Sequence, residues 1–240
     1  MHNVLVTGGS RGIGLAIAKR LVGAGYNVIA VARRETEELA AAVRESEGRL
    51  HFRACDLAAI DAIPAFAKLV RDEFGAIYGL VNNAGVGTEG LLATMHNSDI
   101  EALVRLNVLS PIILTKYVAR QMMADGAGRI INISSIIAST GYNGLSVYGA
   151  TKAAATGFTR SLAREVGKLG ITVNAIAPGF IDTELTHNLS DDGRKRIVGR
   201  SALRRLPETD DVARMVEYLL GEGGRNVTGT VFTIDAGNTA

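Results

Sequence analysis

The side chains best placed to do chemistry are Tyr148 and Lys152, four positions apart in a segment of helical periodicity. That spacing puts both on one face of a helix. A tyrosine hydroxyl titrates at about 10, too high for proton transfer at neutral pH, and a neighbouring ammonium lowers its pKa. The pair therefore predicts an acid–base centre, although an isolated pair of this kind is more often a packed tyrosine beside a solvated lysine.

A serine at the end of an apolar run strengthens the catalytic interpretation. Ser135 follows residues 129–134, a run rich in β-branched isoleucine that is typical of a strand, so we expect it at the carboxyl end of a strand. Open α/β sheets bind ligands at that edge. A hydroxyl there can polarise a carbonyl oxygen. Ser134 is the alternative, and neighbouring strand residues face opposite sides, so only one of the two can point into the site.

A glycine-rich turn, TGGSRGIG at 7–14, joins the first strand-like run to a helical segment. Gly8, Gly12 and Gly14 permit a tight turn and the close approach of a pyrophosphate, which the positive end of a helix attracts. The spacing differs from G-x-G-x-x-G, and a plain turn is the alternative for this stretch alone. It lacks the Gly-Lys-Ser/Thr of a P-loop.

Strands and helices that must position these residues alternate along the whole chain, with no internal repeat. Runs that are apolar on both faces predict strands of a parallel sheet covered by helices on both sides. The expected strands are 4–7, 27–32, 50–54, 77–82, 129–134, 171–177 and 230–234, and the expected helices are 12–23, 35–47, 60–74, 98–124, 147–169 and 209–220. Residues 178–206 are irregular, and we expect them to form a substrate lid on a single domain spanning 1–240.

Composition excludes several classes of protein. The chain has 240 residues and a net charge of +2 from 26 basic and 24 acidic residues, which gives no case for a nucleic-acid partner. Cys55 is the only cysteine and the four histidines are far apart, so we expect no disulfide and no metal site. Without a signal-peptide pattern or an apolar stretch of about 18 residues, a cytoplasmic protein without a membrane span is expected.

The motifs occur together in an order that resembles one family. TGGSRGIG, NNAG at 82–85, and Ser135 followed by Tyr148 and Lys152 resemble the short-chain dehydrogenase/reductase family from about residue 3 to 237. LARE at 162–165, ITVNAIAPGFIDT at 171–183 and LRRLPE at 203–208 resemble its 3-oxoacyl-acyl-carrier-protein reductase branch. The resemblance implies a doubly wound Rossmann fold with a seven-stranded, mostly parallel sheet.

Catalytic roles follow from the resemblance. Ser135 is expected to hold a carbonyl oxygen, and Tyr148 to donate the proton as hydride reaches the carbonyl carbon. Lys152 is expected to tune Tyr148 and to bind the nicotinamide ribose. Asn107 is expected to bend its helix and hold a water molecule that relays protons to Lys152.

An alanine, Ala32, occupies the position after the second strand where an acid would select NAD, and Arg33 follows it. With Arg11 from the glycine turn, Arg33 is expected to bind the 2′-phosphate of NADP(H), whereas Arg34 reads as surface charge. The residues expected to contact the cofactor are Gly8, Ser10, Arg11, Gly12, Ile13, Gly14, Arg33, Asp56, Leu57, Asn83, Ala84, Gly85, Tyr148, Lys152, Pro178, Gly179, Ile181 and Thr183.

The resemblance also divides these contacts. Asp56 and Leu57 are expected to flank the adenine, and residues 83–85 to line the adenosine side. Ile181 and Thr183 are expected near the nicotinamide amide.

The resulting prediction is an NADPH-dependent carbonyl reductase acting on a 3-oxoacyl thioester of CoA or acyl carrier protein. An NADP-dependent dehydrogenase of another small alcohol, sugar, steroid or quinone is the alternative within the same chemistry. A non-catalytic NADP-binding sensor or scaffold is the alternative of another class. Helices 98–124 and 147–169 are apolar on more than one face, and by resemblance they pair in a homodimer or homotetramer. Tyr78 stands where many relatives carry an acid, and the sequence assigns it no role.

Overall fold

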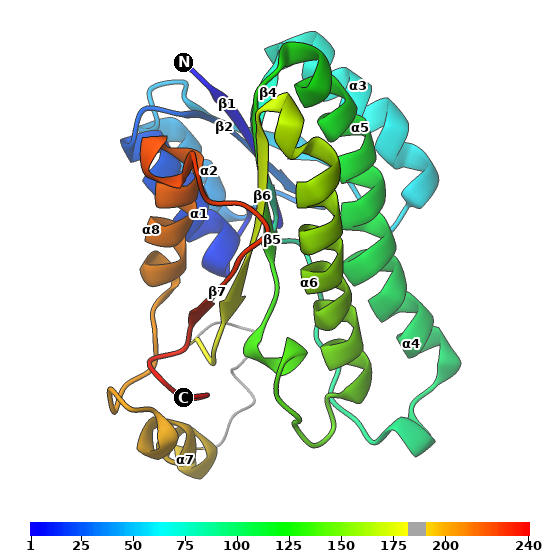
Figure 1. Cartoon of the computed structure of the whole chain (residues 1–240), viewed down its shortest axis with the longest axis vertical. Helices are drawn as coiled ribbons and strands as arrows, with labels where there is room; N and C mark the ends of the chain where they lie inside the picture. The colour runs from blue at the N-terminus through cyan, green and yellow to red at the C-terminus, as the bar shows by residue number, and fades with distance from the viewer. Residues whose placement is uncertain (182–190) are drawn as a thin grey trace.

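A seven-stranded sheet forms the centre of the protein, in the order β3-β2-β1-β4-β5-β6-β7 (Figure 1). The computed structural model describes residues 1–181 and 191–240. Every strand pairing in that part is parallel. The strands are β1 (Asn3–Thr7), β2 (Asn27–Ala32), β3 (Leu50–Ala54), β4 (Ile77–Asn82), β5 (Gly128–Ile133), β6 (Ile171–Pro178) and β7 (Val231–Ile234). The predicted doubly wound fold is confirmed.

Helices cover both faces of the sheet (Figure 1), as runs of doubly buried strand residues require. One face carries α1, α2 and α8, and the other carries α3, α5 and α6. The α-helices in the described residues are α1 (Gly12–Gly23), α2 (Glu37–Glu45), α3 (Ile63–Phe74), α4 (Asn97–Val104), α5 (Ser110–Asp125), α6 (Ser146–Val166), α7 (Asp191–Arg200) and α8 (Thr209–Leu220).

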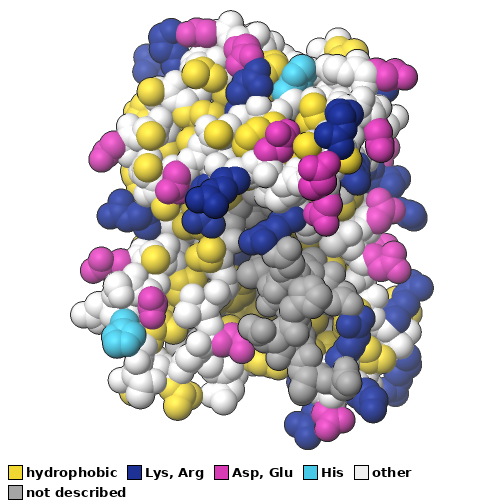
Figure 2. Space-filling model, turned by 180° about the vertical axis from the view of Figure 1, so that it is seen from behind, with side chains coloured by type: hydrophobic (Ala, Val, Ile, Leu, Met, Phe, Trp, Pro, Cys, Tyr) yellow, Lys and Arg dark blue, Asp and Glu magenta, His cyan; other side chains and the backbone are white. Residues whose placement is uncertain are grey.

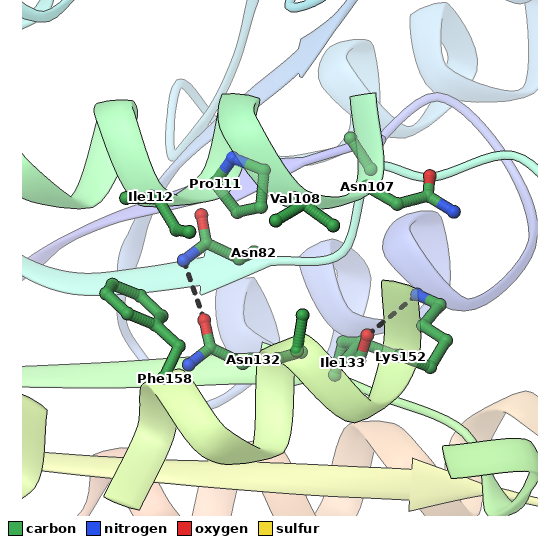
Figure 3. A pocket seen from close by; sticks show the side chains of 12 residues that line it. Asn82, Asn107, Val108, Pro111, Ile112, Asn132, Ile133, Lys152 and Phe158 are labelled. Carbon is green, nitrogen blue, oxygen red and sulfur yellow. Dashed lines mark hydrogen bonds between the residues drawn. The ribbon is translucent and has the colours of Figure 1, made fainter. Parts of the chain in front are cut away.

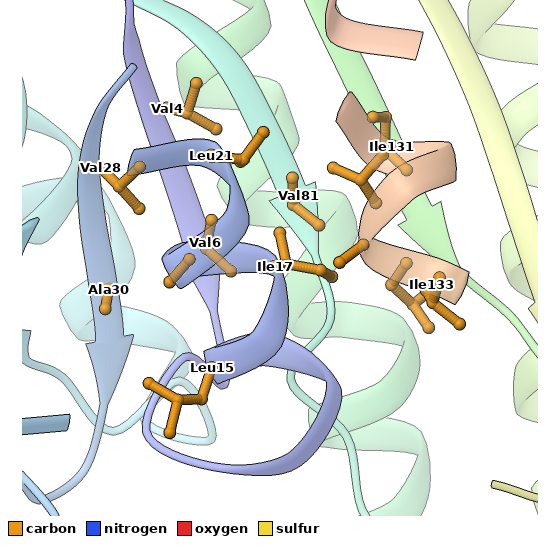
Figure 4. Packing of buried hydrophobic residues seen from close by; sticks show 14 of the residues in the cluster. Val4, Val6, Leu15, Ile17, Leu21, Val28, Ala30, Val81, Ile131 and Ile133 are labelled. Carbon is orange, nitrogen blue, oxygen red and sulfur yellow. The ribbon is translucent and has the colours of Figure 1, made fainter. Parts of the chain in front are cut away.

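Alternating residues of β1 serve two separate cores. Val4 and Val6 pack with Ile17 of α1 and Val81 of β4 (Figure 4), whereas Leu5 belongs to the core beneath α3, α5 and α6. All three β1 side chains are fully buried. Because the side-chain period of a strand is two, a slip of one residue would exchange the two faces. The core thus sets the register of β1 and the place where its terminal turn begins.

The order of the strands reverses beside β1. The chain runs outward from β1 to β2 and β3 on one side, then continues through β4 to β7 on the other. Connections after β1 and β4 therefore leave on opposite faces, which opens a crevice at the carboxyl ends of these strands.

One predicted helix, 98–124, is not regular. It is divided into α4, a π-helical turn at Arg105–Leu109 and α5. A π-turn holds one extra residue and widens the helix, and such turns are frequent at functional sites. Hydrophobic periodicity did not indicate this interruption, because an insertion of one residue leaves each half amphipathic. A second difference is α7, which occupies part of the segment predicted to be an irregular lid.

The same helical run is the one segment of the described residues with the length and apolar composition of a membrane span. By length and mean hydropathy alone, Asn97–Asp125 is long and apolar enough to cross a bilayer. A helix that covers the core of a soluble protein passes the same test, and α5 packs against α3, β4 and β5.

Tyr78 has a structural explanation. Its hydroxyl donates to the carbonyl oxygen of Leu220 at 3.0 Å, at the end of α8. Its ring stacks on His2, with centroids 4.0 Å apart, and the guanidinium of Arg129 lies over the ring at 5.4 Å. Tyr78 therefore joins the start of β4 to α8 at the amino end of the sheet, away from the crevice.

Candidate active site

The glycine turn after β1 depends on close backbone contacts. Gly8 and Gly12 have positive φ angles of 65° and 54°. A Cβ on Gly14 would lie 2.1 Å from the carbonyl oxygen of Gly8, and one on Gly9 would lie 2.8 Å from the Cβ of Ala30. The turn folds back on the start of α1 so tightly that only glycine fits, which leaves backbone N–H groups at the surface of the turn.

The hydroxyl of Thr7 ties this turn to the segment after β4. It donates to the carbonyl oxygen of Val81 at 3.2 Å and accepts from the amides of Asn83 and Ala84 at 2.9 and 3.0 Å. The Asn83 side chain donates to the carbonyl oxygens of Thr7 and Gly8 at 2.9 and 3.2 Å. Asn83 is thus a brace between two loops, and its side-chain nitrogen is already used within the protein.

The positive end of α1 faces outward beside the end of β2. The Arg11 side chain makes no capping hydrogen bond to this helix, and its first turn carries no acidic residue. Ser10 accepts a hydrogen bond from the Thr36 hydroxyl at 2.6 Å, which joins the glycine turn to the segment after β2. Arg11, Arg33 and Arg34 are all exposed. Exposure alone therefore does not distinguish the predicted phosphate ligand Arg33 from its neighbour Arg34. Basic side chains gather near the middle of the face seen in Figure 2.

The π-turn puts Asn107 against the loop that follows β4. Its side-chain oxygen accepts from the Val86 amide at 2.9 Å, and its nitrogen donates to the Val86 carbonyl at 2.8 Å and the Thr151 hydroxyl at 3.2 Å. Asn107 is almost fully buried. Both of its amide hydrogens are used in joining this loop to α6. The bend expected at Asn107 coincides with the π-turn, whereas the water relay stays a prediction.

The two adjacent serines point to different partners. The Ser134 hydroxyl donates to the carbonyl oxygen of Lys152 at 2.9 Å, which anchors α6 to the end of β5. The Ser135 hydroxyl accepts from the Ile137 amide at 3.2 Å and lies near enough to the Tyr148 hydroxyl to lower its pKa. The choice of Ser135 over Ser134 therefore agrees with the geometry, because Ser135 alone meets the tyrosine.

Lys152 is buried, and no carboxylate of the described residues pairs with it. Its Nζ donates to the carbonyl oxygen of Ile133 at 2.9 Å and lies 5.7 Å from the Tyr148 ring centroid. A Cβ on Gly85 would approach this Nζ to 3.5 Å and the Asn107 oxygen to 3.2 Å. Burial lowers the pKa of Lys152 to about 8. Keeping the ammonium in the interior therefore costs free energy, because the charged form loses its hydration.

The net shift of the Tyr148 pKa is opposite to the one expected from a neighbouring ammonium. Burial raises the pKa of Tyr148, and the hydrogen bond with Ser135 offsets this only in part. The physical reason is that the half-buried phenol loses solvation of its charged form, while the ammonium lies beside the ring instead of at the hydroxyl.

A small cavity of about 20 Å³ lies behind Lys152, between α5 and α6, with room for about one water molecule. Figure 3 shows Asn82 and Asn132 at one end of this cavity, and Asn107 and Lys152 at the other. The Asn82 nitrogen donates to the Asn132 oxygen at 2.8 Å and to Thr115 at 2.9 Å. Among the described residues, the buried oxygen of Asn82 has no hydrogen-bond partner.

Several predicted contact residues lie in the core. The side chains of Leu57 and Ile181 are buried. Ile13 packs on the core around α1 and is only partly exposed. Asp56 is exposed and its carboxylate accepts from the Ala58 amide at 3.0 Å.

The segment after β6 begins at the same edge of the sheet. The Gly179 amide donates to the Ile234 carbonyl at 2.8 Å, which continues the pairing of Pro178 with β7. A Cβ on Gly179 would lie 2.7 Å from the Cβ of Asp235. Thr183 lies outside the described residues, as do 182–190 of the predicted lid.

Thr7 and the Asn82–Asn132 pair were missed by sequence reasoning. A polar residue at the end of a buried strand was the available signal, since such side chains need partners on neighbouring elements. Their partners are far away in the sequence, so the signal did not say what they would bind.

Comparison with known proteins supplies the context for this geometry. Residues 2–194 match a family model described as short chain dehydrogenase. The 3-oxoacyl-[acyl-carrier-protein] reductase FabG of Vibrio harveyi is 39% identical over 234 residues, covering 97% of this chain and 95% of the relative.

Solved structures resemble the whole chain as well. A gluconate 5-dehydrogenase from Burkholderia cenocepacia J2315 in complex with NADP and tartrate has a TM-score of 0.94 at 30% identity, covering 99% of this chain and 95% of that one. A blue fluorescent protein from a metagenomic library in complex with NADPH has a TM-score of 0.93 at 35% identity, covering 100% and 98%.

The depressed pKa of Lys152 predicts a pH-dependent stability difference. Between about pH 8 and its ordinary value of 10.5, the unfolded chain holds this proton and the folded chain does not, so the free energy of unfolding rises with pH. Below pH 8 Lys152 is protonated in the folded state, and the full free-energy cost of burying its ammonium is present. We expect the free energy of unfolding of Lys152→Met, taken relative to that of wild type, to be highest at pH 7. This difference is expected to fall by up to about 3 kcal/mol by pH 10.5.

Urea unfolding of both proteins at pH 7, 8.5 and 10 measures this difference. Lys168→Met, which removes an exposed ammonium from the end of the same helical segment, is the control. A difference between Lys152→Met and wild type that does not change with pH would contradict the prediction.

Proposed function

The chain belongs to the short-chain dehydrogenase family and is an NADP-dependent oxidoreductase, and we propose that it reduces the ketone of a 3-oxoacyl thioester with NADPH. The observation that carries the proposal is the meeting of Ser135, Tyr148 and Lys152 at the carboxyl edge of the sheet. The choice of substrate is supported by the 39% identity to a 3-oxoacyl-[acyl-carrier-protein] reductase, which extends over 97% of this chain.

The residues around the crevice fit a dinucleotide. The glycine turn and the start of α1 offer backbone N–H groups without a competing acidic side chain, which suits a pyrophosphate. Ala32 leaves room at the end of β2, and exposed Arg11 and Arg33 supply positive charge on either side of it. We assign these two arginines to the 2′-phosphate of NADP(H).

Reduction of a ketone needs a hydride on its carbon and a proton on its oxygen. The bound dinucleotide supplies the hydride. The Ser135 hydroxyl hydrogen-bonds the carbonyl oxygen, which stabilises the negative charge that develops there. Tyr148 gives its phenolic proton to the same oxygen as the C–H bond forms, so that an alcohol results.

Lys152 acts once Tyr148 has given up its proton. After the proton leaves, the phenolate lies beside the buried Lys152 ammonium, which stabilises it. The Ile133 carbonyl and the anchoring of α6 by Ser134 hold that lysine in place. Asn107 fixes the loop at Val86 against the same helix and acts as a positioning residue.

A complete site argues against a non-catalytic sensor, because such a protein has no use for a buried lysine beside a tyrosine. A sugar acid is the competing substrate, since a gluconate 5-dehydrogenase shares the fold. A docked acyl carrier protein, a homodimer or homotetramer through α5 and α6, and a cytoplasmic location stay predictions.

Consumption of NADPH with acetoacetyl-CoA tests the proposed function. We expect turnover of acetoacetyl-CoA to exceed that of 5-ketogluconate, and Tyr148→Phe to lower kcat/KM at least hundredfold, because the proton donor is lost. NADPH binding by Tyr148→Phe, followed by fluorescence, controls for folding. Turnover of 5-ketogluconate but not acetoacetyl-CoA would reject the thioester, and full activity of Tyr148→Phe would reject the mechanism.

The adjacent serines provide a matched pair of variants. We expect Ser135→Ala to lower kcat at least hundredfold, because it removes the hydrogen bond to the reacting oxygen. Loss of the bond from the Ile137 amide is expected to lower its free energy of unfolding by about 1 kcal/mol. Ser134→Ala is expected to lower the free energy of unfolding by about 1–2 kcal/mol and kcat by less than tenfold, because it releases α6 from β5. Urea unfolding and initial rates distinguish them, and the reverse order of effects would exchange the two roles.

The two arginines after β2 are a second pair. Wild type is expected to prefer NADPH to NADH at least tenfold. Arg33→Ala is expected to lower kcat/KM at least tenfold with NADPH and less than threefold with NADH, because only NADPH carries the 2′-phosphate. Arg34→Ala is the control, with less than threefold change for either coenzyme. Equal losses with both coenzymes in Arg33→Ala would show that Arg33 does not bind the phosphate.

A further inference from the structure

Positive charge is concentrated in one short part of the chain. Residues 194–205, RKRIVGRSALRR, contain six lysines and arginines and no acidic residue. The whole chain carries a net charge of only +2, so the remaining residues are net negative. This basic segment comprises the end of α7 and the turn after it. Figure 2 shows Lys and Arg side chains gathered at the corner of the molecule that α7 occupies in Figure 1.

Three of these arginines lie at the end of α7 and form what we call the arginine cluster. Arg196 and Arg200 are four positions apart, so they share one flank of the helix. The Arg204 guanidinium donates to the carbonyl oxygen of Gly199, which brings it back to the last helical turn beside Arg200. All three arginines are exposed, whereas Ile197 is buried against the protein.

The arginine cluster has no acidic partner among the described residues. Elsewhere on the surface, Arg20 and Arg53 pair with carboxylates, whereas no ion pair in the described part of the chain includes the cluster. Like charges four positions apart on a helix repel each other. Arg204 also has a φ of 53°, a left-handed conformation that is uncommon for a residue other than glycine. Charge repulsion and an unusual backbone at one place indicate a functional site.

The turn that carries Arg204 is bonded to the carboxyl edge of the sheet. The Leu203 amide donates to the carbonyl oxygen of Ala236 at 3.0 Å, in the loop after β7. Ala236 follows Asp235, whose Cβ lies only 2.7 Å from the position of a Cβ on Gly179 at the end of β6. The arginine cluster is therefore joined to the rim of the crevice, outside the catalytic residues.

The chemistry of the arginine cluster favours a phosphate ligand. Guanidinium groups bind phosphate oxygens through paired N–H groups, and arginine is the side chain best suited to this recognition. A CoA thioester carries several phosphates, and its uncharged pantetheine arm separates them from the reacting ketone. When the ketone lies beside Tyr148, the phosphates lie outside the crevice.

A compact anion fits the arginine cluster better than an acidic protein does. A stable protein interface buries about 800 Å² on each partner, whereas the cluster occupies the end of one helix and one turn. Exposed carboxylates of Asp192 and Glu208 lie on either side of the basic segment in the sequence. They would repel an acidic protein that covered a wider area.

We propose that Arg196, Arg200 and Arg204 bind the phosphates of a CoA thioester substrate. This inference rests on the proposed function, and it assigns CoA, instead of acyl carrier protein, as the carrier of the 3-oxoacyl group. The phosphates take no part in the reaction. They are held equally in the ground state and the transition state, so the cluster lowers KM and leaves kcat unchanged.

The test compares kcat/KM for acetoacetyl-CoA and for acetoacetyl-pantetheine, which has the same ketone and arm but no phosphate, with saturating NADPH. Wild type is expected to prefer the CoA thioester at least tenfold. This preference is expected to fall as NaCl is raised from about 50 to about 300 mM, because salt screens exposed charges. Arg200→Gln and Arg204→Gln are each expected to lower kcat/KM at least threefold for acetoacetyl-CoA, through KM, and less than about 1.5-fold for acetoacetyl-pantetheine.

Two further variants separate the phosphate contact from other effects. Lys195→Gln removes an exposed cation from the same helix, two positions before buried Ile197 and therefore on the outer side, and is expected to change neither substrate. Arg200→Lys keeps the charge and is expected to retain most of the preference. The Arg200 side chain makes no bond in the described part of the chain, so Arg200→Gln gives a folded variant even where Arg204→Gln does not, and thermal unfolding checks both.

Failure of this inference is distinguishable from failure of the proposed function. Equal losses with both thioesters in Arg200→Gln, while wild type turns both over, would overturn the phosphate site and leave the function intact. A loss in Arg200→Gln with acetoacetyl-acyl carrier protein but not with acetoacetyl-CoA would overturn CoA as the carrier. Absence of turnover with all three thioesters in wild type, despite reduction of another ketone, would overturn the proposed function and the phosphate site with it.

Discussion

The rest of the site depends on the burial of a lysine that has no acidic partner among residues 1–181 and 191–240, the part of the chain that the structure describes. The Lys152 ammonium is taken out of water, which costs free energy and lowers its pKa to about 8. Its Nζ donates a hydrogen bond to the backbone carbonyl of Ile133 at the end of β5. A backbone oxygen offsets the lost hydration only partly, whereas a carboxylate would neutralise the charge. The protein thereby keeps a cation beside Tyr148 that is not committed to another charged group.

Holding such a group requires rigid surroundings, and polar contacts between loops supply them. Ser134 fixes the backbone of Lys152 to β5, Asn107 fixes Val86 to α6 from the π-turn, and Thr7 joins the turn after β1 to the segment after β4. Each bond links elements that hydrophobic packing alone would leave free to slide. The sheet and its two cores bring these elements to one edge, and the polar side chains then adjust them to the accuracy that chemistry needs.

The same division between apolar and polar contacts explains the shape of the crevice. On one side, glycines let backbone pass within contact distance and leave N–H groups for a pyrophosphate. On the other, Tyr142, Phe180 and the exposed leucines after Gly90 present apolar surface. Ser135 and Tyr148 flank Tyr142 in the sequence and lie at the same edge of the sheet.

Local pattern was enough to predict the seven strands, most helices and the shared face of Tyr148 and Lys152, because helix and strand periods and glycine turns are properties of neighbouring residues. Local pattern left Ser134 and Ser135 as alternatives, and the choice of Ser135 came from the resemblance to the family. The π-turn at Asn107, helix α7, the bracing role of Asn83 and the raised pKa of Tyr148 came only with the packed molecule. Burial, a charge's distance from a hydroxyl and the meeting of Tyr142 with Phe180 depend on segments far apart in the sequence, and no local pattern contains them.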